Sequence, residues 1–582
     1  MKKRTFPEYL KAFNELKRTI YPNAKPLRVA VLRSYTCETI EPMLSVDAFD
    51  NGFMCEFFFG GYRQYAQEIL NLAGELYNFN PDITILMIGI EDIAPQVFDA
   101  SKMAEGDDLA AMESFLDAYF ALIIKLRSRV SGAIIINNFV RPHFLTNTHF
   151  DTMADLGYAD LLRMANMRLG QEVKSLESCY ILDIDGLASR FGLNNIFDTK
   201  SWYHSKNPYT IQFYAEISQC LASLINAIHN IRKKCIVLDL DNTMWRGIIG
   251  EDGLEGIEIS TSYADFQRQL LFWKQTGIIL AICSKNNYED AAEVFKSHDS
   301  MVLTLEDFSA MRINWQDKAS NIADIAKELN IGLDSMIYID DSDFECELVH
   351  SRHPEIHVIQ LDGNSVNYPD IARKLPLLDF VFLTDEDRAR TGMYKAQSKR
   401  DALMSEAGSL EDFLASLETI VTIEVMKDST ILRASQLTQK TNQFNLTTRR
   451  YTVDDLKQMT LDGFDIYIIS TRDKFGDNGI SGLLVIHADS VENQWCIDTF
   501  LLSCRVMGRD VEKGVWGYVA SKAKVAGINK IVGKYIPTPK NKPVEMLLPS
   551  LGFTEKNGEL VFEVSNGYAC PDYISVEEKE EK

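Results

Sequence analysis

Two aspartates spaced by two residues close an apolar run near the middle of the chain. Asp239 and Asp241 follow the run Cys235 to Leu238, which the pattern predicts to be a buried strand. Side chains two residues apart on a strand project to the same side, and open α/β folds bind ligands at the carboxyl ends of their parallel strands. Asp239 can attack phosphorus and form an aspartyl phosphate, while Asp241 can protonate the leaving oxygen and later activate water. The pair therefore predicts phosphoryl-transfer chemistry.

Three further polar motifs follow this pair along the chain. Ser284 closes the next predicted strand and offers a hydroxyl and a backbone N–H to a phosphoryl oxygen. Lys318 can neutralise charge on the nucleophile and on the phosphoryl group. Asp340 and Asp341 close a third predicted strand, and carboxylate oxygens are the ligands that Mg²⁺ prefers. Because the acids and the serine each close a strand, we expect these groups to meet at one edge of a parallel sheet.

The order of these motifs, D-x-D-x-T and then Ser, Lys and Asp-Asp, resembles the haloacid dehalogenase superfamily of phosphotransferases. The chain between the motifs is too short for a separate cap domain, so the phosphate site should be open to a large substrate or covered by neighbouring domains. The resemblance implies Mg²⁺ as the cofactor and a phosphorylated small molecule as the substrate. It assigns catalysis to Asp239, Asp241, Ser284 and Lys318, phosphate binding to Asn242, Thr243, Ser284, Lys285 and Lys318, and metal binding to Asp239, Asp241, Asp340 and Asp341.

Longer stretches narrow this resemblance. The segments 239–256, 284–287 and 436–451 resemble the FkbH-like family, and the similarity extends from Leu27 to Phe553. The resemblance implies a phosphatase-like domain joined to an acetyltransferase-like domain. It also implies transfer of a glyceryl group from 1,3-bisphosphoglycerate to an acyl carrier protein, with loss of phosphate.

A second candidate site follows the predicted strand Trp495 to Leu502. A loop that contains glycine leads into a helix, and a helix N-terminus offers N–H groups and a positive dipole end to a pyrophosphate. Arg505, Gly508 and Arg509 resemble the acyl-CoA loop of the GNAT acetyltransferases, which implies binding of acyl-CoA or of a phosphopantetheine thioester. Asp510 stands where that loop usually has Gly or Ala, and its carboxylate either caps the helix or leaves room for the pyrophosphate. The alternative is a degenerate fold used for packing.

Acyl transfer through a thioester needs a thiolate. Cys504 is predicted to lie near a helix N-terminus beside Arg505, where a thiol pKa is lowered, and is assigned a catalytic role. Cys283, beside Ser284, is the rival, and the alternative for each is a small buried residue. The window 521–542 holds six lysines and no acid, and is either a solvated face or a docking patch for an acidic carrier protein or for CoA phosphates.

Apolar runs predict the elements that position these groups. Up to about residue 230 they alternate with helical patterns such as Leu109 to Arg127, which indicates an SGNH-hydrolase-like or flavodoxin-like α/β domain. Ser34 follows Arg33 rather than a Gly-Asp pair, and Asp198 and His204 lie six apart where SGNH hydrolases have three, so we expect a scaffold or substrate-shaping domain. The strands predicted in this domain are Leu27–Leu32, Ile83–Ile88, Ala133–Ile136 and Cys179–Leu182.

The rest of the chain is predicted to hold a capless phosphotransferase domain of Rossmann-like α/β type and a GNAT-like α+β domain. The strands predicted in the former are Cys235–Leu238, Ile278–Cys283, Met301–Leu303 and Met336–Ile339, and those in the latter are Ile420–Val425, Asp465–Ser470, Gly482–His487 and Trp495–Leu502, with one helix after Gly508. The expected bounds are 1–230 for the first domain, 231–385 for the phosphotransferase domain, 386–404 for a charged helical connector, 405–570 for the GNAT-like domain and 571–582 for a charged tail.

Composition limits the partners. Lys and Arg number 60 and Asp and Glu 83, a net charge of −23, which disfavours nucleic-acid and anionic-membrane surfaces. No run of about 18 uncharged apolar residues occurs. The ten cysteines form no C-x-x-C pair. We therefore expect a cytoplasmic protein with reduced thiols.

Three functions remain open on this basis. The first is an enzyme that couples phosphatase chemistry to glyceryl or acyl transfer. The second is a Mg²⁺-dependent phosphomonoesterase fused to an acyl-CoA-dependent acyltransferase that modifies a sugar or amine in surface-polysaccharide or natural-product biosynthesis. The third is a binding protein that has kept the fold without turnover, and the complete set of five phosphoryl-transfer residues argues against it.

Overall fold

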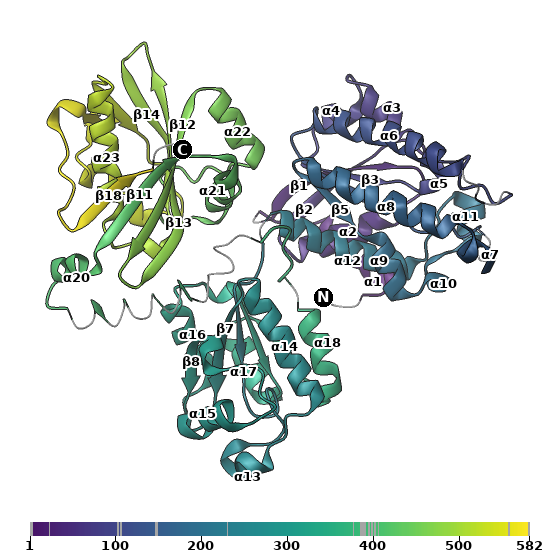
Figure 1. Ribbon diagram of the computed structural model, residues 1–582, viewed down its shortest axis with the longest axis horizontal. Helices are drawn as coiled ribbons and strands as arrows, with labels where there is room; N and C mark the ends of the chain where they lie inside the picture. The colour runs from purple at the N-terminus through teal and green to yellow at the C-terminus, as the bar shows by residue number, and fades with distance from the viewer. Residues whose placement is uncertain are drawn as a thin grey trace. The chain divides into compact units, whose positions relative to one another are not determined.

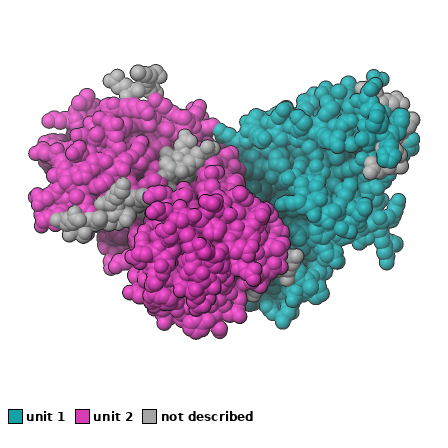
Figure 2. Space-filling model, turned by 60° about the horizontal axis from the view of Figure 1, so that its bottom comes forward, with its two compact units in different colours: residues 1–229 teal, residues 230–582 magenta. Residues whose placement is uncertain are grey.

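The chain forms two compact units. The computed structural model is drawn in Figure 1. The first unit is Met1–His229 and the second is Asn230–Lys582, and Figure 2 shows them in different colours. The described residues form one sheet in the first unit and two in the second. The structure describes residues 4–22, 24–101, 104, 107–145, 149–229, 231–375, 377–383, 392–393, 396, 400, 403–404, 407–556 and 559–579.

The first unit is built on a parallel sheet in the order β2-β1-β3-β4-β5, which is the flavodoxin-like order. Figure 1 shows helices on both faces, with α6 (Asp108–Arg127) and α8 (Tyr158–Ser175) on one side and α2 (Ile40–Phe49) and α12 (Ile211–Ile228) on the other. Strands covered on both faces read as nearly continuous apolar runs, and the predicted parallel α/β layer is confirmed. The strands are β1 (Lys25–Arg33), β2 (Phe53–Phe59), β3 (Ile83–Met87), β4 (Ala133–Asn137) and β5 (Cys179–Leu182), and the remaining helices are α1 (Phe6–Leu16), α3 (Tyr65–Leu70), α4 (Glu75–Phe79), α5 (Ile90–Ile93), α7 (His149–Met153), α9 (Ile184–Phe191), α10 (Leu193–Ile196) and α11 (Thr199–Ser205).

The second sheet carries the predicted phosphotransferase residues. It is parallel throughout in the order β10-β9-β6-β7-β8, so β6 lies at its centre and the carboxyl ends of β6, β7 and β9 share one edge. Between β6 and β7 the chain forms only two helices, α13 and α14. The elements are β6 (Cys235–Leu238), α13 (Ile249–Gly256), α14 (Thr261–Gln275), β7 (Ile279–Ser284), α15 (Tyr288–Ser297), β8 (Phe308–Ile313), α16 (Lys318–Glu328), β9 (Met336–Asp340), α17 (Asp343–Arg352), β10 (His357–Gln360) and α18 (Tyr368–Arg373).

One predicted strand of this domain is wrong. Met301–Leu303 is not a strand, and the strand that pairs with β7 is β8, a few residues later. The buried Gln267 side chain explains the difference, because its Oε1 accepts hydrogen bonds from the N–H groups of Val302 at 2.8 Å and of Leu303 at 3.2 Å. Those groups are therefore satisfied by a side chain of α14 and need no neighbouring strand.

The third sheet has eight strands in the order β16-β17-β15-β14-β13-β12-β11-β18. β11 to β14 are antiparallel neighbours, whereas β14 and β15 run parallel and pair only at Gln494 to Cys496. The helix predicted after Gly508 is confirmed as α23 (Val511–Val525). The other elements are α20 (Leu410–Leu417), β11 (Thr419–Val425), α21 (Asp428–Lys440), α22 (Val453–Leu461), β12 (Phe464–Asp473), β13 (Gly476–Asp489), β14 (Gln494–Leu502), β15 (Lys530–Gly533), α24 (Leu547–Ser550), β16 (Thr554–Lys556), β17 (Glu559–Glu563) and β18 (Ile574–Glu578).

The end of the chain differs from the charged tail expected at 571–582. β18 pairs in parallel with β11, from Thr419 opposite Ile574 to Ile423 opposite Glu578. The buried side chain of Ile574 and the unpaired edge of β11 explain this, because an open strand edge pairs with an available extended segment. Most of the expected helical connector, 386–404, lies outside the described residues. No helix in the described ranges is long and apolar enough to cross a membrane.

A glycine before β4 provides a test of the first unit. A Cβ added at Gly132 would lie 2.4 Å from the backbone oxygens of both Pro81 and Asp82, which cannot move independently of the sheet. We expect Gly132→Ala to cost about 1–3 kcal/mol and to accelerate hydrogen exchange of the β4 amides several-fold. Gly170→Ala in α8 is the matched control, because a Cβ there meets nothing within 4 Å. Equal exchange in both variants would contradict the packing described for Gly132.

Candidate active site

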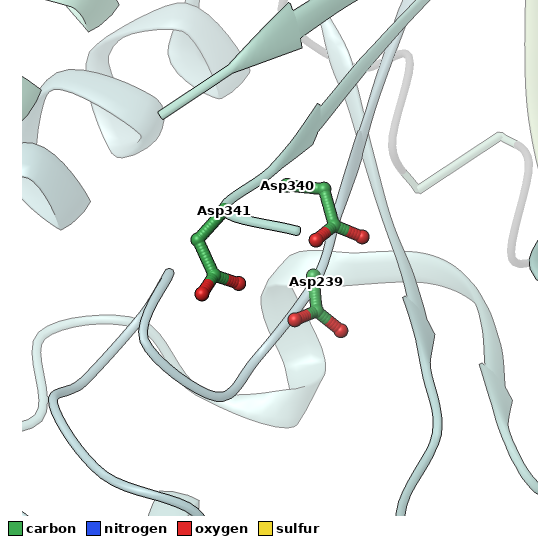
Figure 3. Close-up of side chains that lie close together, drawn as sticks. All are labelled: Asp239, Asp340 and Asp341. Carbon is green, nitrogen blue, oxygen red and sulfur yellow. The ribbon is translucent and has the colours of Figure 1, made fainter. Parts of the chain in front are cut away.

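Two neighbouring strands bring the predicted acids together. β6 and β9 pair in parallel up to Leu238 opposite Ile339, so the residues that follow lie side by side. Asp239, Asp340 and Asp341 each offer one carboxylate oxygen, and these atoms lie within 4.8 Å of one another. Figure 3 shows the three side chains close together. Asp239 and Asp340 are buried and Asp341 is half-buried. In the described part of the chain, this is the one cluster of three such potential metal ligands.

A buried lysine lies against two of these acids. Lys318 is the first residue of α16, where Asp317 caps the helix by accepting a hydrogen bond from the N–H of Ser320 at 2.9 Å. Lys318 Nζ lies 2.8 Å from Asp239 Oδ1 and 2.6 Å from Asp340 Oδ2. The helix start therefore fixes the ammonium between the predicted nucleophile and the predicted metal ligand.

The site holds more negative than positive charge. Burial raises the pKa of Asp239 to about 7. The positive charge of Lys318 acts to lower this pKa, and the negative charge of Asp340 acts to raise it. Burial, followed by the charge of Asp340, raises the pKa of Asp341 to about 6. Burial alone would lower the pKa of Lys318, but the two acids outweigh it and raise that pKa, so the ammonium stays charged. A cation bound among these oxygens would relieve the excess negative charge.

This donor set fits Mg²⁺. Mg²⁺ is a hard cation that prefers oxygen ligands and is usually held by one or two carboxylates. The three clustered carboxylates supply such oxygens, and no sulfur or imidazole belongs to the cluster. Of the four acids predicted to hold the metal, Asp239, Asp340 and Asp341 converge and the carboxylate of Asp241 does not.

Asp241 is held by other groups. Its Oδ1 accepts hydrogen bonds from Trp245 Nε1 at 3.0 Å and from the N–H of Ile249 at 3.1 Å, and its Oδ2 accepts one from Asn286 Nδ2 at 3.0 Å. Asn286 Nδ2 also donates to Ser284 Oγ at 3.2 Å, at the end of β7. These bonds orient Asp241 as an acid or base and explain why its carboxylate is absent from the metal cluster.

Asn286 was missed as a site residue by the sequence reasoning. It links the predicted acid Asp241 to the predicted phosphate ligand Ser284. The signal available was its position two residues after Ser284, in the segment that follows the strand. The hydrogen bond from Asn286 to Asp241 joins two segments far apart in the sequence. Its amide can be recognised as a site group only once β6 and β7 are known to be neighbours.

The other predicted phosphate ligands are placed differently. Asn242 has a positive φ of 53°, and its Oδ1 accepts a hydrogen bond from the N–H of Gly247 at 3.0 Å. Thr243 is fully buried, and its hydroxyl has no hydrogen-bond partner among the described residues. Lys285 Nζ lies 2.6 Å from Glu345 Oε1. The structure thus gives Asn242 and Lys285 partners within the protein, and phosphate binding by these residues stays a prediction.

Tyr338 is a second residue that the sequence reasoning missed. Its hydroxyl donates to Asp340 Oδ2, while Asp340 Oδ1 accepts a hydrogen bond from the N–H of Ser342 at 2.8 Å. Burial, followed by the charge of Asp340, raises the pKa of Tyr338 well above its usual value, so the phenol stays a donor. The available signal was the spacing of two residues, which places Tyr338 and Asp340 on the same side of β9. Tyr338 is therefore a positioning residue for Asp340.

The second predicted site does not present its charged residues as expected. Arg509 is 5% exposed, and its Nη1 lies 3.0 Å from Asp473 Oδ2, so its guanidinium is engaged in a buried ion pair rather than offered to a pyrophosphate. Arg505 Nε donates to Ser503 Oγ at 3.3 Å. Gly508 has a positive φ of 74° and open space where a Cβ would stand. Asp510 is the N-cap of α23 but makes no capping hydrogen bond, and its carboxylate instead accepts bonds from Lys513 Nζ and the Tyr573 hydroxyl.

The two candidate thiols differ in what the structure describes. Cys504 begins a short 3₁₀ turn, Cys504–Val506, and its side chain lies outside the described residues, so its catalytic role stays a prediction. Cys283 is fully buried in β7, and burial raises its thiol pKa well above the usual value. Burial of this kind makes a cysteine inert, so Cys283 matches the buried-residue alternative.

The lysine-rich window is partly paired. Lys522 lies 2.6 Å from Glu578, Lys530 lies 3.3 Å from Glu492 and Lys534 lies 3.6 Å from Glu559. Three of the six lysines therefore have acidic neighbours, which favours the solvated face for this half of the window. Docking of an acidic partner by the remaining lysines stays a prediction.

Solved structures include one that is similar to about two thirds of this chain. The N-terminal part of protein BF1531 from Bacteroides fragilis, which contains a phosphatase domain complexed with Mg, is 26% identical, covers 65% of this chain and 100% of its own, and has a TM-score of 0.58. A spermidine N-acetyltransferase mutant from Vibrio cholerae is 11% identical, covers 25% of this chain and 95% of its own, with a TM-score of 0.20. A GNAT-family acetyltransferase from Desulfovibrio desulfuricans is 12% identical, covers 25% and 99%, with a TM-score of 0.20.

One family model matches part of the first unit. None of the curated proteins matches this chain. Residues 28–226 match the family model described as the FkbH N-terminal domain. These residues begin within β1, include β2 to β5 and extend into α12. The resemblance expected from the sequence is confirmed for this part of the chain, where residues 28–226 match the FkbH N-terminal domain.

Proposed function

We propose that the chain is a Mg²⁺-dependent phosphoryl-transfer enzyme that forms an aspartyl phosphate on Asp239. The observation that carries this proposal is the contact of one buried ammonium, Lys318 Nζ, with Asp239 and Asp340 at 2.8 and 2.6 Å. An ammonium fixed beside both the nucleophile and a metal ligand offsets the charge of a phosphoryl group placed there. The likeness to a Bacteroides fragilis phosphatase-domain structure complexed with Mg supports the same chemistry.

The roles follow from the contacts. An oxygen of Asp239 bonds to phosphorus while the bond from phosphorus to the leaving oxygen breaks, and Asp241 gives a proton to that oxygen. Asp241 then takes a proton from the water that attacks phosphorus, which releases phosphate and restores Asp239. Trp245 and Asn286 keep Asp241 oriented through both steps. Lys318 compensates negative charge, and Ser284 offers its hydroxyl to the phosphoryl oxygens.

Mg²⁺ would be held by Asp239, Asp340 and Asp341. When bound, it supplies Lewis-acid stabilisation of the phosphoryl charge. Tyr338 and the N–H of Ser342 keep Asp340 in place for this role.

A more specific proposal concerns the substrate and the acceptor. The FkbH resemblance and the FkbH N-terminal domain at residues 28–226 support an acyl phosphate such as 1,3-bisphosphoglycerate, with the glyceryl group passed to the phosphopantetheine thiol of an acyl carrier protein. A thiolate sulfur, of Cys504 or of the carrier's phosphopantetheine arm, would bond to the acyl carbon while the bond from that carbon to the phosphate oxygen breaks, which leaves a 3-phosphoglyceryl thioester and free phosphate. Removal of the remaining phosphate through Asp239 would then give the glyceryl thioester. The second candidate is a phosphomonoesterase fused to an acyl-CoA-dependent acyltransferase, supported by the β14–loop–α23 order of the third sheet.

The first test removes the nucleophile. Asp239→Asn keeps the size of the side chain but loses the attacking carboxylate, so phosphate release from p-nitrophenyl phosphate in Mg²⁺ should fall at least about 100-fold. Asp299→Asn, at an exposed position, is the matched control and should keep wild-type turnover. Residual activity of Asp239→Asn above about one per cent of wild type would rule out this residue as the nucleophile.

A second test concerns the metal. EDTA should stop turnover, and Tyr338→Phe should raise the Mg²⁺ concentration for half-maximal activity by about 10-fold or more, because residues that orient metal ligands affect affinity on that scale. The maximal rate at saturating Mg²⁺ should change less than this concentration does. The control is Tyr288→Phe, an exposed tyrosine on α15. A Mg²⁺ dependence equal to wild type would contradict the role of Tyr338.

A third test separates the two substrate proposals. Intact-protein mass spectrometry after mixing with 1,3-bisphosphoglycerate and Mg²⁺ should show a glyceryl adduct that hydroxylamine removes, because a thioester is cleaved by that nucleophile. Cys504→Ala should abolish the adduct and leave phosphate release from p-nitrophenyl phosphate intact. If wild type forms no adduct and loads no carrier protein, the phosphomonoesterase candidate replaces glyceryl transfer.

A further inference from the structure

One edge of β14 is left without a neighbouring strand. β14 pairs with β13 over most of its length, from Gln494 opposite Asp489 to Leu502 opposite Gly482. On its other side it pairs with β15 only from Gln494 to Cys496. From 497 to 502 the two parallel strands are no longer hydrogen-bonded to each other. An open edge of this kind is where an extended ligand can add itself as a strand.

This edge is filled by the chain itself. The N–H of Leu446 donates to the carbonyl of Phe500 at 3.1 Å, and the N–H of Leu502 donates to the carbonyl of Phe444 at 3.0 Å. Asn445 thereby forms an antiparallel bridge with Leu501. We name the three residues 444–446 the edge segment. It belongs to the stretch 436–451 that carries the FkbH resemblance.

The edge segment is bonded on its far side as well. The N–H of Ile536, in the chain after β15, donates to the carbonyl of Leu446 at 2.9 Å. The fully buried Asn541 donates through Nδ2 to the carbonyls of Asn445 and Ile536, both at 2.9 Å, while its Oδ1 accepts the N–H of Thr538 at 2.7 Å. The edge segment therefore joins β14 to the chain after β15, and its three carbonyls and the N–H of Leu446 are hydrogen-bonded.

We infer that acyl-CoA cannot pair with the edge of β14 from 497 to 502. The edge segment already uses the backbone groups that the amides of a pantetheine arm would need. An extended arm that paired with this edge would compete for the carbonyl of Phe500 and the N–H of Leu502. Asn445 and Leu446 are fully buried there, so no room is left for a second chain of atoms. The inference is independent of the chemistry proposed at Asp239.

The phosphate end of such a ligand meets a second obstacle. The N-terminus of α23 would attract a pyrophosphate, but Asp510 stands at the N-cap with its carboxylate in the same region. Arg509, which directly precedes Asp510 in that loop, is buried against Asp473. Both observations agree with the closed edge, because neither Arg509 nor Asp510 offers a favourable partner to a pyrophosphate.

The test uses the full chain. Calorimetric titration with acetyl-CoA up to about 1 mM should give no saturable heat. The amides of Leu446 and Ile536 should remain protected in hydrogen exchange, with and without acetyl-CoA. These two amides report the edge segment specifically, because the N–H of Leu502 could bond to either partner. Saturable binding with loss of protection at Leu446 and Ile536 would overturn the inference. Saturable binding with both amides still protected would place the ligand elsewhere and support a closed edge.

A matched pair of variants tests what holds the edge segment. Asn541→Asp keeps the shape of the side chain but replaces the two donated bonds with repulsion from the carbonyls of Asn445 and Ile536. We expect exchange at Leu446 and Ile536 to accelerate about 10-fold or more, as for loss of a buried hydrogen bond. Asn529→Asp, at an exposed position in the same domain, is the control. Equal exchange in the two variants would overturn the role of Asn541.

Discussion

The contacts of Lys318 with Asp239 and Asp340 determine how the central domain is organised. Three carboxylates gathered at the end of a parallel sheet repel one another, and burying them away from water adds a desolvation cost. The ammonium of Lys318, fixed at the first turn of α16 between Asp239 and Asp340, offsets part of that cost. Removing one partner of a buried ion pair is costly because the charge of the remaining partner is left uncompensated. The raised pKa values of Asp239 and Asp341 reflect the part of the cost that the ammonium does not offset, and a further cation would lower it.

The same strand polarity that gathers the acids also gathers the groups that orient them. β6, β7 and β9 end at one edge because all pairings in the second sheet are parallel. Asn286 reaches Asp241 from the end of β7, and Tyr338 reaches Asp340 along β9 itself. Asp241 and Asp340 are thus oriented by different neighbours, whereas Asp239 and Asp340 share the ammonium of Lys318.

The third sheet illustrates that a fold does not specify its ligand. Its strand, loop and helix follow the order expected of an acyl-CoA site, yet the polar groups in that region are bonded to other parts of the same domain. Phe444 and Leu446 use the open edge of β14, and Asp473 engages Arg509. Acyl transfer by this chain, where it occurs, would then take its acyl group from a donor bound elsewhere than along β14.

Much of the fold could be predicted because local sequence controls it. The buried strands β1, β3, β4, β6 and β9 read as apolar runs, since strands covered on both faces need no polar alternation. β2 was not predicted, and Met301–Leu303 was wrongly predicted as a strand because the bonds from Gln267 that satisfy Val302 and Leu303 come from a distant helix. The pairing of Ile574–Glu578 with β11 likewise depends on an edge that the end of the sequence does not reveal.

The sequence by itself determined which residues could do the chemistry. Asp239, Asp241, Ser284 and the Asp340-Asp341 pair come at or just after the ends of predicted strands, with Lys318 between Ser284 and Asp340, and residue types and predicted strand ends are local properties. Only the tertiary structure decided which of them meet. It placed Asp341 in the carboxylate cluster with Asp239 and Asp340. Hydrogen bonds from Trp245, Ile249 and Asn286 hold Asp241 outside that cluster. It also buried Arg509 and filled the edge of β14. These outcomes depend on hydrogen bonds and ion pairs between segments far apart in the chain, whose partners are chosen when the sheets assemble.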